Sequence, residues 1–356
     1  MKPLQNQLPE SQTAHSLSQS AALVIDVRSP GEFAKGRLPN SINLPILTDD
    51  ERHQVGLTYK TEGNAAATRL GHSLVSGDVR KSRLSAWQTA IGDQPQALLA
   101  CWRGGARSTI AQTWLSEVGL EVPRIKGGYK SVRTSCLKEL EAARIKQWWI
   151  LGGRTGVGKT IAIQKLRHAI DLEKLAQHRG SAFGRYPGQD DVQPAQATFE
   201  NELAYEVVRH AGEVLILEDE SRMIGRIAIP ESWHQKMSQA PVVLLEASLT
   251  QRSQHIYEEY VRTPLQQGIT PDQLATHLKQ CLQRISRRLG GARHQQVDRL
   301  LTTAFDGEGE HQAWIAQLLK DYYDPMYDYQ LAKKAHRIQF RGDMESVSQY
   351  LTSLTD

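Results

Sequence analysis

Short apolar runs separated by helical patterns mark the first part of the chain. Runs at 22–27 (ALVIDV), within 36–45 (GRLPNSINLP) and at 97–100 (ALLA) end in polar or turn-forming residues, which is typical of buried strands. Over 108–118 the apolar residues recur at the spacing of a helix. The stretch 48–87 is more polar and also helix-like, and we interpret it as an ordered insertion. Strands that alternate with helices predict an α/β domain.

The hydrophobic pattern of the second part predicts another parallel sheet. The run at 147–151 (QWWIL) opens onto a glycine-rich turn, and further apolar runs follow at 214–217 (VLIL) and 241–245 (PVVLL). The run at 161–170 (IAIQKLRHAI) is helical in pattern, as is most of the chain from about 253 onward. Runs that are apolar throughout, without alternation, are typical of parallel strands buried on both faces.

A charged connector at 137–146 separates the two patterns. We place the domain boundary near residue 140, which gives a first domain at 1–140 and a second at 141–356 with a helical C-terminal extension. A chain of 356 residues is long enough for two such domains, and 40% hydrophobic residues can form two sizeable cores.

Charge and cysteine content narrow the class of protein. The formal net charge is +4, which permits RNA or a phosphate compound as a partner without requiring one. Three widely spaced cysteines are too few for a disulfide framework or a cysteine-rich zinc site. The first residues lack the apolar core of a secretory signal, and no apolar run reaches the about 20 residues that cross a bilayer. We therefore expect a soluble cytoplasmic protein with no membrane partner.

The loop CWRGGARS at 101–108 is the first candidate for chemistry. Cys101 follows a predicted strand and precedes a helix start, where backbone N–H groups and the helix dipole stabilise negative charge. A thiol placed there beside two arginines is expected to ionise easily and to act as a nucleophile. The candidate anion-binding residues of the loop are Arg103, Gly104, Gly105, Arg107 and Ser108. The alternative, a buried structural cysteine, suits Cys136 and Cys281, which lack such surroundings.

The second candidate is GRTGVGKT at 153–160, a full match to the P-loop pattern. It follows a predicted strand and precedes a helical run, which is the context that a P-loop requires. The glycines expose backbone amides to a di- or triphosphate, the lysine reaches the phosphates, and the threonine can bind Mg²⁺. The candidate diphosphate-binding residues are Gly153, Gly156, Gly158, Lys159 and Thr160.

Three further clusters carry weaker signals. The run EDE at 218–220 ends a predicted strand, and Glu218 or Asp219 is a candidate for ordering Mg²⁺ through water, with a merely solvated cluster as the alternative. The segment HRGSAFGR at 178–185 is a candidate RNA or phosphate contact or else an ordinary surface loop. Its candidate contact residues are Arg179, Phe183 and Arg185. The acidic, tyrosine-rich segment DYYDPMYDY at 321–329 gives no interpretable chemistry.

The first candidate site lies among motifs that resemble the rhodanese family. These motifs are VIDVRSPGEF and GRLPNSINLP before the cysteine loop and KGGYKS at 126–131 after it. The resemblance implies a rhodanese-like fold whose cysteine carries a transferable sulfur, or a heavier chalcogen, as a persulfide-type adduct. Five residues separate Cys101 from Arg107. The loop is therefore one residue longer than in the usual sulfur-transferring rhodaneses and has the same length as the phosphate-binding loops of phosphatases. This spacing suggests a tetrahedral phosphorus compound as the ligand.

Along nearly its whole length the chain resembles the tRNA 2-selenouridine synthase family. The segments with that family's character and order are DERHQVGLTYK, CWRGGARS, GGYKSVR, GGRTGVGKT, HRGSAFGR, LEDESRMIG and YYDPMYDYQLAKKA. The resemblance implies a transferase that replaces the sulfur of 2-thiouridine at the tRNA wobble position with selenium from selenophosphate. It also implies transfer of a geranyl group from geranyl diphosphate to that sulfur, which turns the sulfur into a better leaving group.

The resemblance implies a role for each candidate site. The Cys101 loop is expected to hold selenophosphate, from which the thiolate takes selenium while phosphate leaves. The P-loop, with Lys159, Thr160 and Mg²⁺, is expected to hold the diphosphate of geranyl diphosphate as a leaving group. No tightly bound organic cofactor is expected. The implied partners are the anticodon stem-loop of a tRNA that carries 2-thiouridine and the enzyme that produces selenophosphate.

Other classes of function stay open on the sequence alone. In one, the P-loop uses ATP, and the protein is an ATP-dependent tRNA thiolation enzyme or a kinase-like enzyme. In another, the chain is a non-catalytic phosphate-sensing module, against which the intact cysteine and arginines count. The loop spacing also permits a phosphatase, although Ala100 stands where many such enzymes have a histidine.

Overall fold

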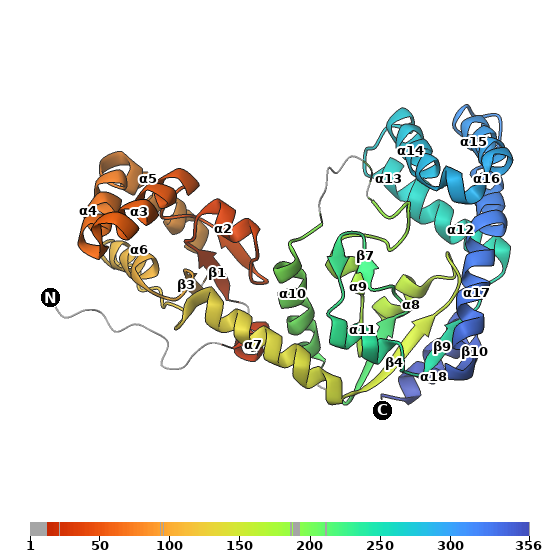
Figure 1. The fold of residues 1–356 in the computed structure, drawn as a ribbon, viewed down its shortest axis with the longest axis horizontal. Helices are drawn as coiled ribbons and strands as arrows, with labels where there is room; N and C mark the ends of the chain where they lie inside the picture. The colour runs from red at the N-terminus through yellow and green to blue at the C-terminus, as the bar shows by residue number, and fades with distance from the viewer. Residues whose placement is uncertain are drawn as a thin grey trace. The chain divides into compact units, whose positions relative to one another are not determined.

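The computed structural model describes residues 13–20, 22–92, 94, 96–185, 187, 193–210 and 212–355. These residues form two compact units, each of which is visible in Figure 1. Unit 1 contains the described residues up to Ala143 together with Pro194–Arg209, and unit 2 contains those from Arg144 to Gln193 and from His210 onward. Within the described ranges, no helix combines the length and the apolar character needed to cross a membrane.

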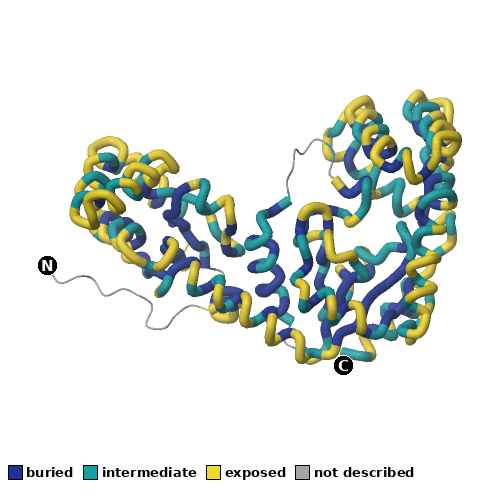
Figure 2. The backbone as a smooth tube through the Cα atoms, viewed as in Figure 1, coloured by how far each residue is buried: buried dark blue, intermediate teal, exposed yellow. Residues whose placement is uncertain are grey.

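Unit 1 is built on a three-stranded parallel sheet in the order β2-β1-β3. Its strands are β1 (Leu23–Asp26), β2 (Ser41–Asn43) and β3 (Ala97–Ala100), and its helices are α1 (Ala14–Gln19), α2 (Pro30–Ala34), α3 (Asp49–Glu62), α4 (Asn64–Leu74), α5 (Gly77–Ile91), α6 (Ala106–Ser116), α7 (Gly128–Ala142) and α10 (Gln196–Arg209). Ile25, Leu99 and Cys101 belong to one core cluster with Trp87 of α5 and Trp114 of α6. Figure 2 shows β1 and β3 buried, whereas much of α3 and α4 is exposed.

The elements predicted for unit 1 are confirmed, with small shifts at their ends. The three predicted strands are β1, β2 and β3, and the helix predicted at 108–118 begins two residues earlier, at Ala106. The polar stretch at 48–87 forms α3, α4 and most of α5. A capping box starts α3, because the side chains of Thr48 and Glu51 each accept a hydrogen bond from the other residue's backbone N–H.

Helix α10 belongs to unit 1 although it follows a long segment of unit 2. Asn201 of α10 donates from Nδ2 to the carbonyl oxygen of Arg37 at 2.8 Å, and its Oδ1 accepts from Arg133 of α7 at 3.0 Å. Asn201 is fully buried, so these hydrogen bonds fix the place of the helix. A single boundary near residue 140 therefore does not describe the division, because the chain returns to unit 1 over Pro194–Arg209.

Unit 2 is built on a five-stranded parallel sheet in the order β10-β9-β4-β6-β5. Its strands are β4 (Gln147–Gly152), β5 (Ala169–Ile170), β6 (Val214–Glu218), β9 (Val242–Leu245) and β10 (Ile338–Gly342), and the separate antiparallel pair is β7 (Met223–Ile224) with β8 (Ile227–Ala228). Strand β4 lies in the middle and ends at the predicted P-loop. Both predicted parallel sheets, and with them the α/β fold class, are therefore confirmed.

Helices of unit 2 lie on both faces of this sheet and in a separate C-terminal region. They are α8 (Lys159–Lys165), α9 (Leu172–Ala176), α11 (Glu231–Met237), α12 (Leu249–Tyr257), α13 (Thr263–Gln266), α14 (Pro271–Leu289), α15 (Gly291–Phe305), α16 (His311–Leu318), α17 (Asp324–Lys334) and α18 (Met344–Ser353), with the short turns η1 (Ala143–Ile145), η2 (Glu258–Arg262), η3 (Leu319–Tyr323) and η4 (Ala335–Arg337). Trp148 packs on Trp233 of α11 with ring centroids 4.7 Å apart, whereas Trp149 joins the core cluster of α8 and α18. Burial of alternate β4 side chains on opposite faces explains why this strand is apolar throughout.

A second core lies among the C-terminal helices. Leu274, Leu278 and Leu282 follow each other at four-residue spacing along α14, and all three are buried. They pack in one cluster with residues of α15, α16 and η3. This cluster confirms the predicted helical C-terminal region.

Two strands of unit 2 lie where the sequence predicts helix. Strand β10 is an edge strand whose alternate residues are exposed, so its apolar signal is weak. Strand β5 has two residues and follows α8, which ends at Lys165 although the predicted helical run continues to 170. A strand this short carries no periodic pattern, and pairing with β6 decides its conformation.

The glycines of KGGYKS lie against the backbone of the cysteine loop. Gly128 has a φ of +61°, and a Cβ placed there would clash with the carbonyl oxygen of Cys101 and lie 2.5 Å from the backbone nitrogen of Gly104. The Tyr129 N–H donates to the carbonyl oxygen of Cys101 at 2.9 Å. The start of α7 thus supports the loop by a backbone contact that leaves no room for a side chain.

We expect Gly128→Ala to destabilise unit 1 by more than about 3 kcal/mol, because the added methyl group must displace backbone atoms. Gly119→Ala is the matched control, since Gly119 also has a positive φ, +83°, but open space around its Cβ position. Its expected cost is about 1 kcal/mol. Denaturant unfolding of the full-length chain measures both free energies. Equal losses in the two variants would contradict the close contact.

Candidate functional site

The cysteine loop connects the end of β3 to the start of α6. Cys101 is 3% exposed, and its Sγ lies 3.2 Å from the Oγ of Ser108 in the first turn of α6. Gly104 permits this turn because it adopts a φ of +66°, and Gly105 is the residue before the helix. The sequence therefore folds locally as predicted, with the sulfur at the junction of a buried strand and a helix. Because Ser108 is fully buried, its hydroxyl is held against the sulfur.

The two loop arginines have different surroundings. Arg107 forms an ion pair with Glu32 of α2 in which Nη1 and Nη2 both donate, the latter to Oε1 at 3.2 Å. Burial opposes ionisation of Glu32, but the hydrogen bond and the charge of Arg107 outweigh it and lower the pKa of this carboxyl. Arg103 is exposed. Glu32 orients Arg107 and leaves its Nε for another acceptor.

An aromatic pair lies beside the cysteine. Trp102 is 40% exposed and stacks on Tyr129 of α7, with ring centroids 5.4 Å apart and planes at 28°. Arg28 lies 4.0 Å from the centroid of the Tyr129 ring and is itself buried in an ion pair with Asp26 at 2.7 Å. We did not predict these roles, although Asp26, Arg28 and Trp102 all stand inside motifs that the sequence singled out. An exposed ring with a rigid support is suited to stacking on a base.

The other two cysteines have structural surroundings. Burial raises the pKa of the Cys136 thiol to about 12, and burial also raises the pKa of Cys281. Both lie in the interior of helical packing, Cys136 in α7 and Cys281 in α14. Thiols that resist ionisation in this way are poor nucleophiles.

The predicted P-loop has the expected backbone form. It joins β4 to α8, and its glycines Gly153, Gly156 and Gly158 have positive φ values. Lys159 donates from Nζ to the carbonyl oxygen of Gly153 at 3.3 Å, and this Nζ lies 5.9 Å from the ring centroid of Tyr327. The lysine therefore folds back over its own loop, within reach of a bound phosphate group.

Three glutamates surround this lysine. Glu218 ends β6 opposite Leu151 of β4, is 1% exposed, and has no hydrogen-bond partner at either carboxylate oxygen. Burial raises its pKa well above the usual value, and the nearby charge of Glu173 raises it further. Burial, and after it the nearby charge of Glu220, raises the pKa of Glu173 to about 8. Burial also raises the pKa of Glu220 to about 7.

The pattern EDE is thus not a solvated cluster. Asp219 pairs with Lys334 of α17, with Nζ to Oδ2 at 2.7 Å. Within the described ranges, no three His, Cys, Asp or Glu side chains converge on one metal position. The unpartnered Glu218 oxygens and the hydroxyl of Thr160 are donors of the kind that Mg²⁺ accepts when substrate phosphates complete its coordination.

The tyrosine-rich segment, uninterpreted from sequence, provides partners for the P-loop region. Asp324 accepts from Nη1 of the buried Arg252 at 3.1 Å, and Arg252 donates from Nε to the carbonyl oxygen of Thr155 at 2.9 Å. Asp328 accepts from Nε of Arg154 at 2.8 Å. Asp328 therefore binds α17 to the P-loop directly, and Asp324 does so through Arg252. The negative charges of Asp324 and Asp328 balance the positive charges of Arg252 and Arg154, and a phosphate ligand would be attracted to the same arginines.

The candidate contact residues of the segment HRGSAFGR have different surroundings. Phe183 is 5% exposed and belongs to the core of the C-terminal helices, so its ring is not available for stacking. Arg179 pairs with Glu259 at 2.9 Å and lies 4.5 Å from the ring centroid of Tyr260. Arg185 is exposed. The prediction that Phe183 contacts RNA is wrong, because the C-terminal helices bury its ring.

Comparison with known proteins covers both units. Residues 10–135 match the rhodanese-like domain, and residues 146–356 match the tRNA 2-selenouridine synthase AAA domain. A curated relative from Sulfurovum sp. (strain NBC37-1) named tRNA 2-selenouridine synthase is 43% identical over 97% of this chain and 98% of the relative. Another of the same name, from Hahella chejuensis, is 45% identical over 94% of this chain and 92% of the relative. The relative of that name in Marinobacter nauticus is 43% identical over 93% of this chain and 94% of its own.

The glutamates around Lys159 predict a stability that falls as pH rises. A carboxyl whose pKa is higher in the folded than in the unfolded state binds more protons when folded, so ionisation opposes folding. With a usual pKa of 4.5 and a folded pKa of about 8 for Glu173, the window runs between these two values. We expect Glu173→Gln to make unit 2 more stable than the unsubstituted chain at pH 8 by on the order of 1–2 kcal/mol, with little difference at pH 4.5.

Urea unfolding of the full-length chain at several pH values measures this difference. Glu308→Gln, at an exposed position of unit 2, is the control and should leave the pH dependence unchanged. A Glu173→Gln variant whose stability runs parallel to that of the unsubstituted chain would contradict the assignment.

Proposed function

Since the chain belongs to the tRNA 2-selenouridine synthase family, we propose that it replaces the sulfur of 2-thiouridine at the tRNA wobble position with selenium. The proposed selenium donor is selenophosphate, and the proposed intermediate is the S-geranylated uridine made from geranyl diphosphate. The observation that carries the proposal is one chain with two anion sites at strand ends, a Cys-x5-Arg loop and a P-loop. We place the reaction in the cytoplasm, with the anticodon stem-loop as the RNA partner and the selenophosphate-producing enzyme as supplier.

In the first step the P-loop would bind geranyl diphosphate. The thiocarbonyl sulfur attacks the first carbon of the geranyl group, a carbon–sulfur bond forms, the carbon–oxygen bond breaks, and diphosphate leaves while the base loses its N3 proton. Lys159 and the amides of Gly156 and Gly158 would bind the leaving diphosphate. Mg²⁺ held by Thr160 and Glu218 would neutralise its charge. Nothing in this step requires a nucleotide, because the loop recognises phosphates.

Cys101 could attack selenophosphate at selenium or at phosphorus, and the two cases differ in their electron balance. Taking selenium onto the thiolate with release of phosphate is a two-electron oxidation, whereas attack at phosphorus needs no electron acceptor. We therefore place the attack at phosphorus, so that a sulfur–phosphorus bond forms, the phosphorus–selenium bond breaks, and selenium leaves as selenide with the electron pair. Water then cleaves the phosphocysteine to phosphate. The Cys-x5-Arg spacing supports this choice, since it suits a tetrahedral phosphorus group.

The residues of the cysteine loop have matching roles in this step. Arg103, Arg107 and the amides after Cys101 would bind the phosphoryl oxygens. The Ser108 hydroxyl, 3.2 Å from Sγ, would stabilise the thiolate as it attacks and as it leaves. The released selenide attacks C2 of the geranylated base, a carbon–selenium bond forms, the carbon–sulfur bond breaks, and geranyl thiolate leaves and takes up a proton.

The two half-reactions should separate by mutation. Cys101→Ser is expected to geranylate thiolated tRNA and to lose selenium insertion by at least about 100-fold, because only the thiolate opens selenophosphate. Lys159→Ala is expected to lose geranylation by a similar factor and to selenate tRNA that was geranylated beforehand. Mass spectrometry of the nucleosides from synthetic anticodon stem-loops measures both products.

Controls accompany this experiment. Cys136→Ser replaces a buried thiol of unit 1, and Lys165→Ala replaces an exposed lysine of α8, and both should keep both activities. If Cys101→Ser and Lys159→Ala each lose both steps while folded and bound to tRNA, the division of labour is wrong. ATP turnover that tRNA stimulates and Lys159→Ala abolishes would instead support the ATP-dependent alternative.

Trp102 is our candidate for the aromatic that holds the target base next to Cys101. Because stacking on an aromatic ring contributes about 1–3 kcal/mol per base, Trp102→Ala should raise the KM for geranylated stem-loop about tenfold in the selenation assay. Trp102→Phe should retain most of the affinity, since the ring is kept. Equal KM values for Trp102→Ala and the unsubstituted chain would contradict this role.

A further inference from the structure

Unit 1 contains a cavity of about 600 Å³ that the proposed reaction steps leave unused. It lies between the loop after β2, the α3–α4 hairpin and α6. The α3–α4 hairpin is part of the polar stretch at 48–87, to which the sequence analysis assigned no role. Cavities of roughly 300–1,000 Å³ are typical of small-molecule sites.

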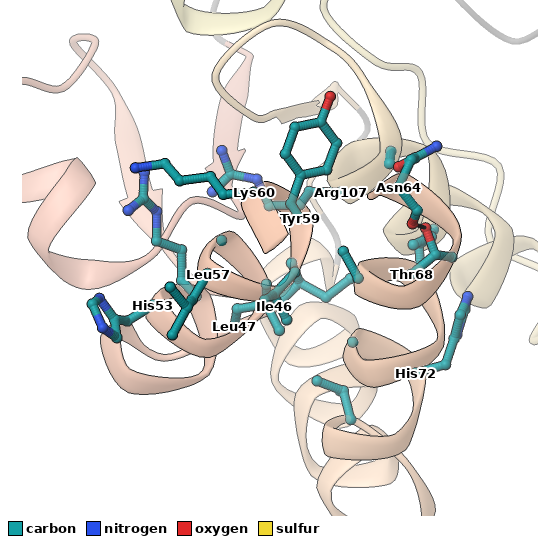
Figure 3. A pocket seen from close by; sticks show the side chains of 18 of the residues that line it. Ile46, Leu47, His53, Leu57, Tyr59, Lys60, Asn64, Thr68, His72 and Arg107 are labelled. Atoms are coloured by element: carbon teal, nitrogen blue, oxygen red, sulfur yellow. Dashed lines mark hydrogen bonds between the residues drawn. The ribbon is translucent and has the colours of Figure 1, made fainter. Parts of the chain in front are cut away.

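The cavity combines apolar walls with cationic side chains. Ile46, Leu47 and Val75 are buried in its lining, and Ile110 and Trp114 of α6 add to it. In Figure 3 the side chains of Lys60 and Arg107 lie together on one side of the pocket, and Ile46 and Leu47 lie below them.

The charge of the lining has one sign. Arg52, Lys60 and Arg107 all line the cavity, whereas none of the described residues that line it is Asp or Glu. Glu32, which pairs with Arg107 and also lies 3.8 Å from Arg52, is not among the lining residues. An apolar chamber with only cations at its edge suits an apolar group that is attached to an anion.

The cavity and the cysteine loop share walls. Ile46, Val75 and Trp114 belong to the same core cluster as Cys101. Arg107 is both the arginine of the cysteine loop and a lining residue of the cavity, and Ala106 beside it also lines the cavity. A base at Cys101 would therefore have an apolar chamber next to it within the same unit.

We propose that this cavity holds the geranyl group of the S-geranylated uridine while selenium replaces the sulfur. This inference rests on the proposed function. The geranyl chain must travel with the base to Cys101, and burial there removes its apolar surface from water. Arg52 and Lys60 then face the RNA phosphates that accompany the base. Geranyl diphosphate itself is a different occupant, because its diphosphate is assigned to the P-loop of unit 2.

The test compares binding of two synthetic anticodon stem-loops to the full-length chain without selenophosphate. One carries S-geranyl-2-thiouridine, and the other carries S-methyl-2-thiouridine. We expect the geranylated RNA to bind at least about tenfold more tightly, as judged by fluorescence anisotropy. Leu57→Asp puts a charge on the cavity wall and Thr68→Trp narrows it, and each should bring the ratio of the two dissociation constants to about one.

A matched control separates the cavity from general surface effects. Leu57 is 56% exposed and Leu137 of α7 is 46% exposed, and Leu137 does not line the cavity. Leu137→Asp should therefore preserve the ratio. All three variants should still geranylate thiolated stem-loop, because the P-loop performs that step.

The outcomes distinguish this inference from the proposed function. Equal affinity of the unsubstituted chain for both stem-loops, or a ratio that survives both cavity variants, overturns the inference. Loss of geranylation in Leu57→Asp and Thr68→Trp overturns it too, because the cavity would then hold geranyl diphosphate. In each of these cases selenation of geranylated tRNA by the unsubstituted chain leaves the proposed function standing, and only its failure removes that function.

Discussion

Both candidate sites depend on one constraint of backbone geometry. A chain that leaves the carboxyl end of a parallel strand and enters a helix must turn within a few residues, and glycines with positive φ make that turn possible. Gly104 does so between β3 and α6, and Gly153 begins the corresponding turn between β4 and α8. The turn directs backbone N–H groups to the strand end, where an anion can bind. The same geometry places a thiol in unit 1 and a lysine in unit 2.

Ion pairs keep the cations of both sites in place. Glu32 holds Arg107, Asp328 holds Arg154, and Asp324 holds Arg252. Each pair fixes the orientation of a guanidinium, since carboxylate and guanidinium are planar groups that match, and Asp324 also limits the cost of burying Arg252. A phosphate ligand offers the same geometry and more charge. The carboxylates therefore orient the arginines for anion binding, and α17 couples the C-terminal helices to the P-loop.

The carboxyls around Lys159 differ from those that pair with arginines, because their pKa values are raised. Burial and the negative charges of neighbouring carboxylates raise the pKa values of Glu173, Glu218 and Glu220, which favours their protonated forms. The positive charge of Lys159 lowers the pKa of each of them and so partly offsets the effect of burial. Perturbed pKa values of this kind are common where ligands bind.

Local patterns in the sequence determined both candidate loops and most strands. CWRGGARS and GRTGVGKT each form a turn and a helix start from contiguous residues, so their form depends on neighbours only a few positions away. The strands β1, β3 and β4 were equally readable, because their apolar runs are buried by any parallel sheet.

Tertiary structure alone decided the partners of these residues. Arg107 and Glu32 are 75 positions apart, and Arg154 and Asp328 are 174 positions apart, beyond the reach of any periodic pattern. For the same reason, the return of α10 to unit 1, the edge strand β10 and the burial of Phe183 required the fold. The cavity beside Cys101 likewise exists only because α6 and the α3–α4 hairpin pack without filling the space between them. Sequence patterns indicate which residues prefer to be buried. The shape of a cavity and the partners of a charged side chain depend instead on how segments that are distant in the sequence pack together.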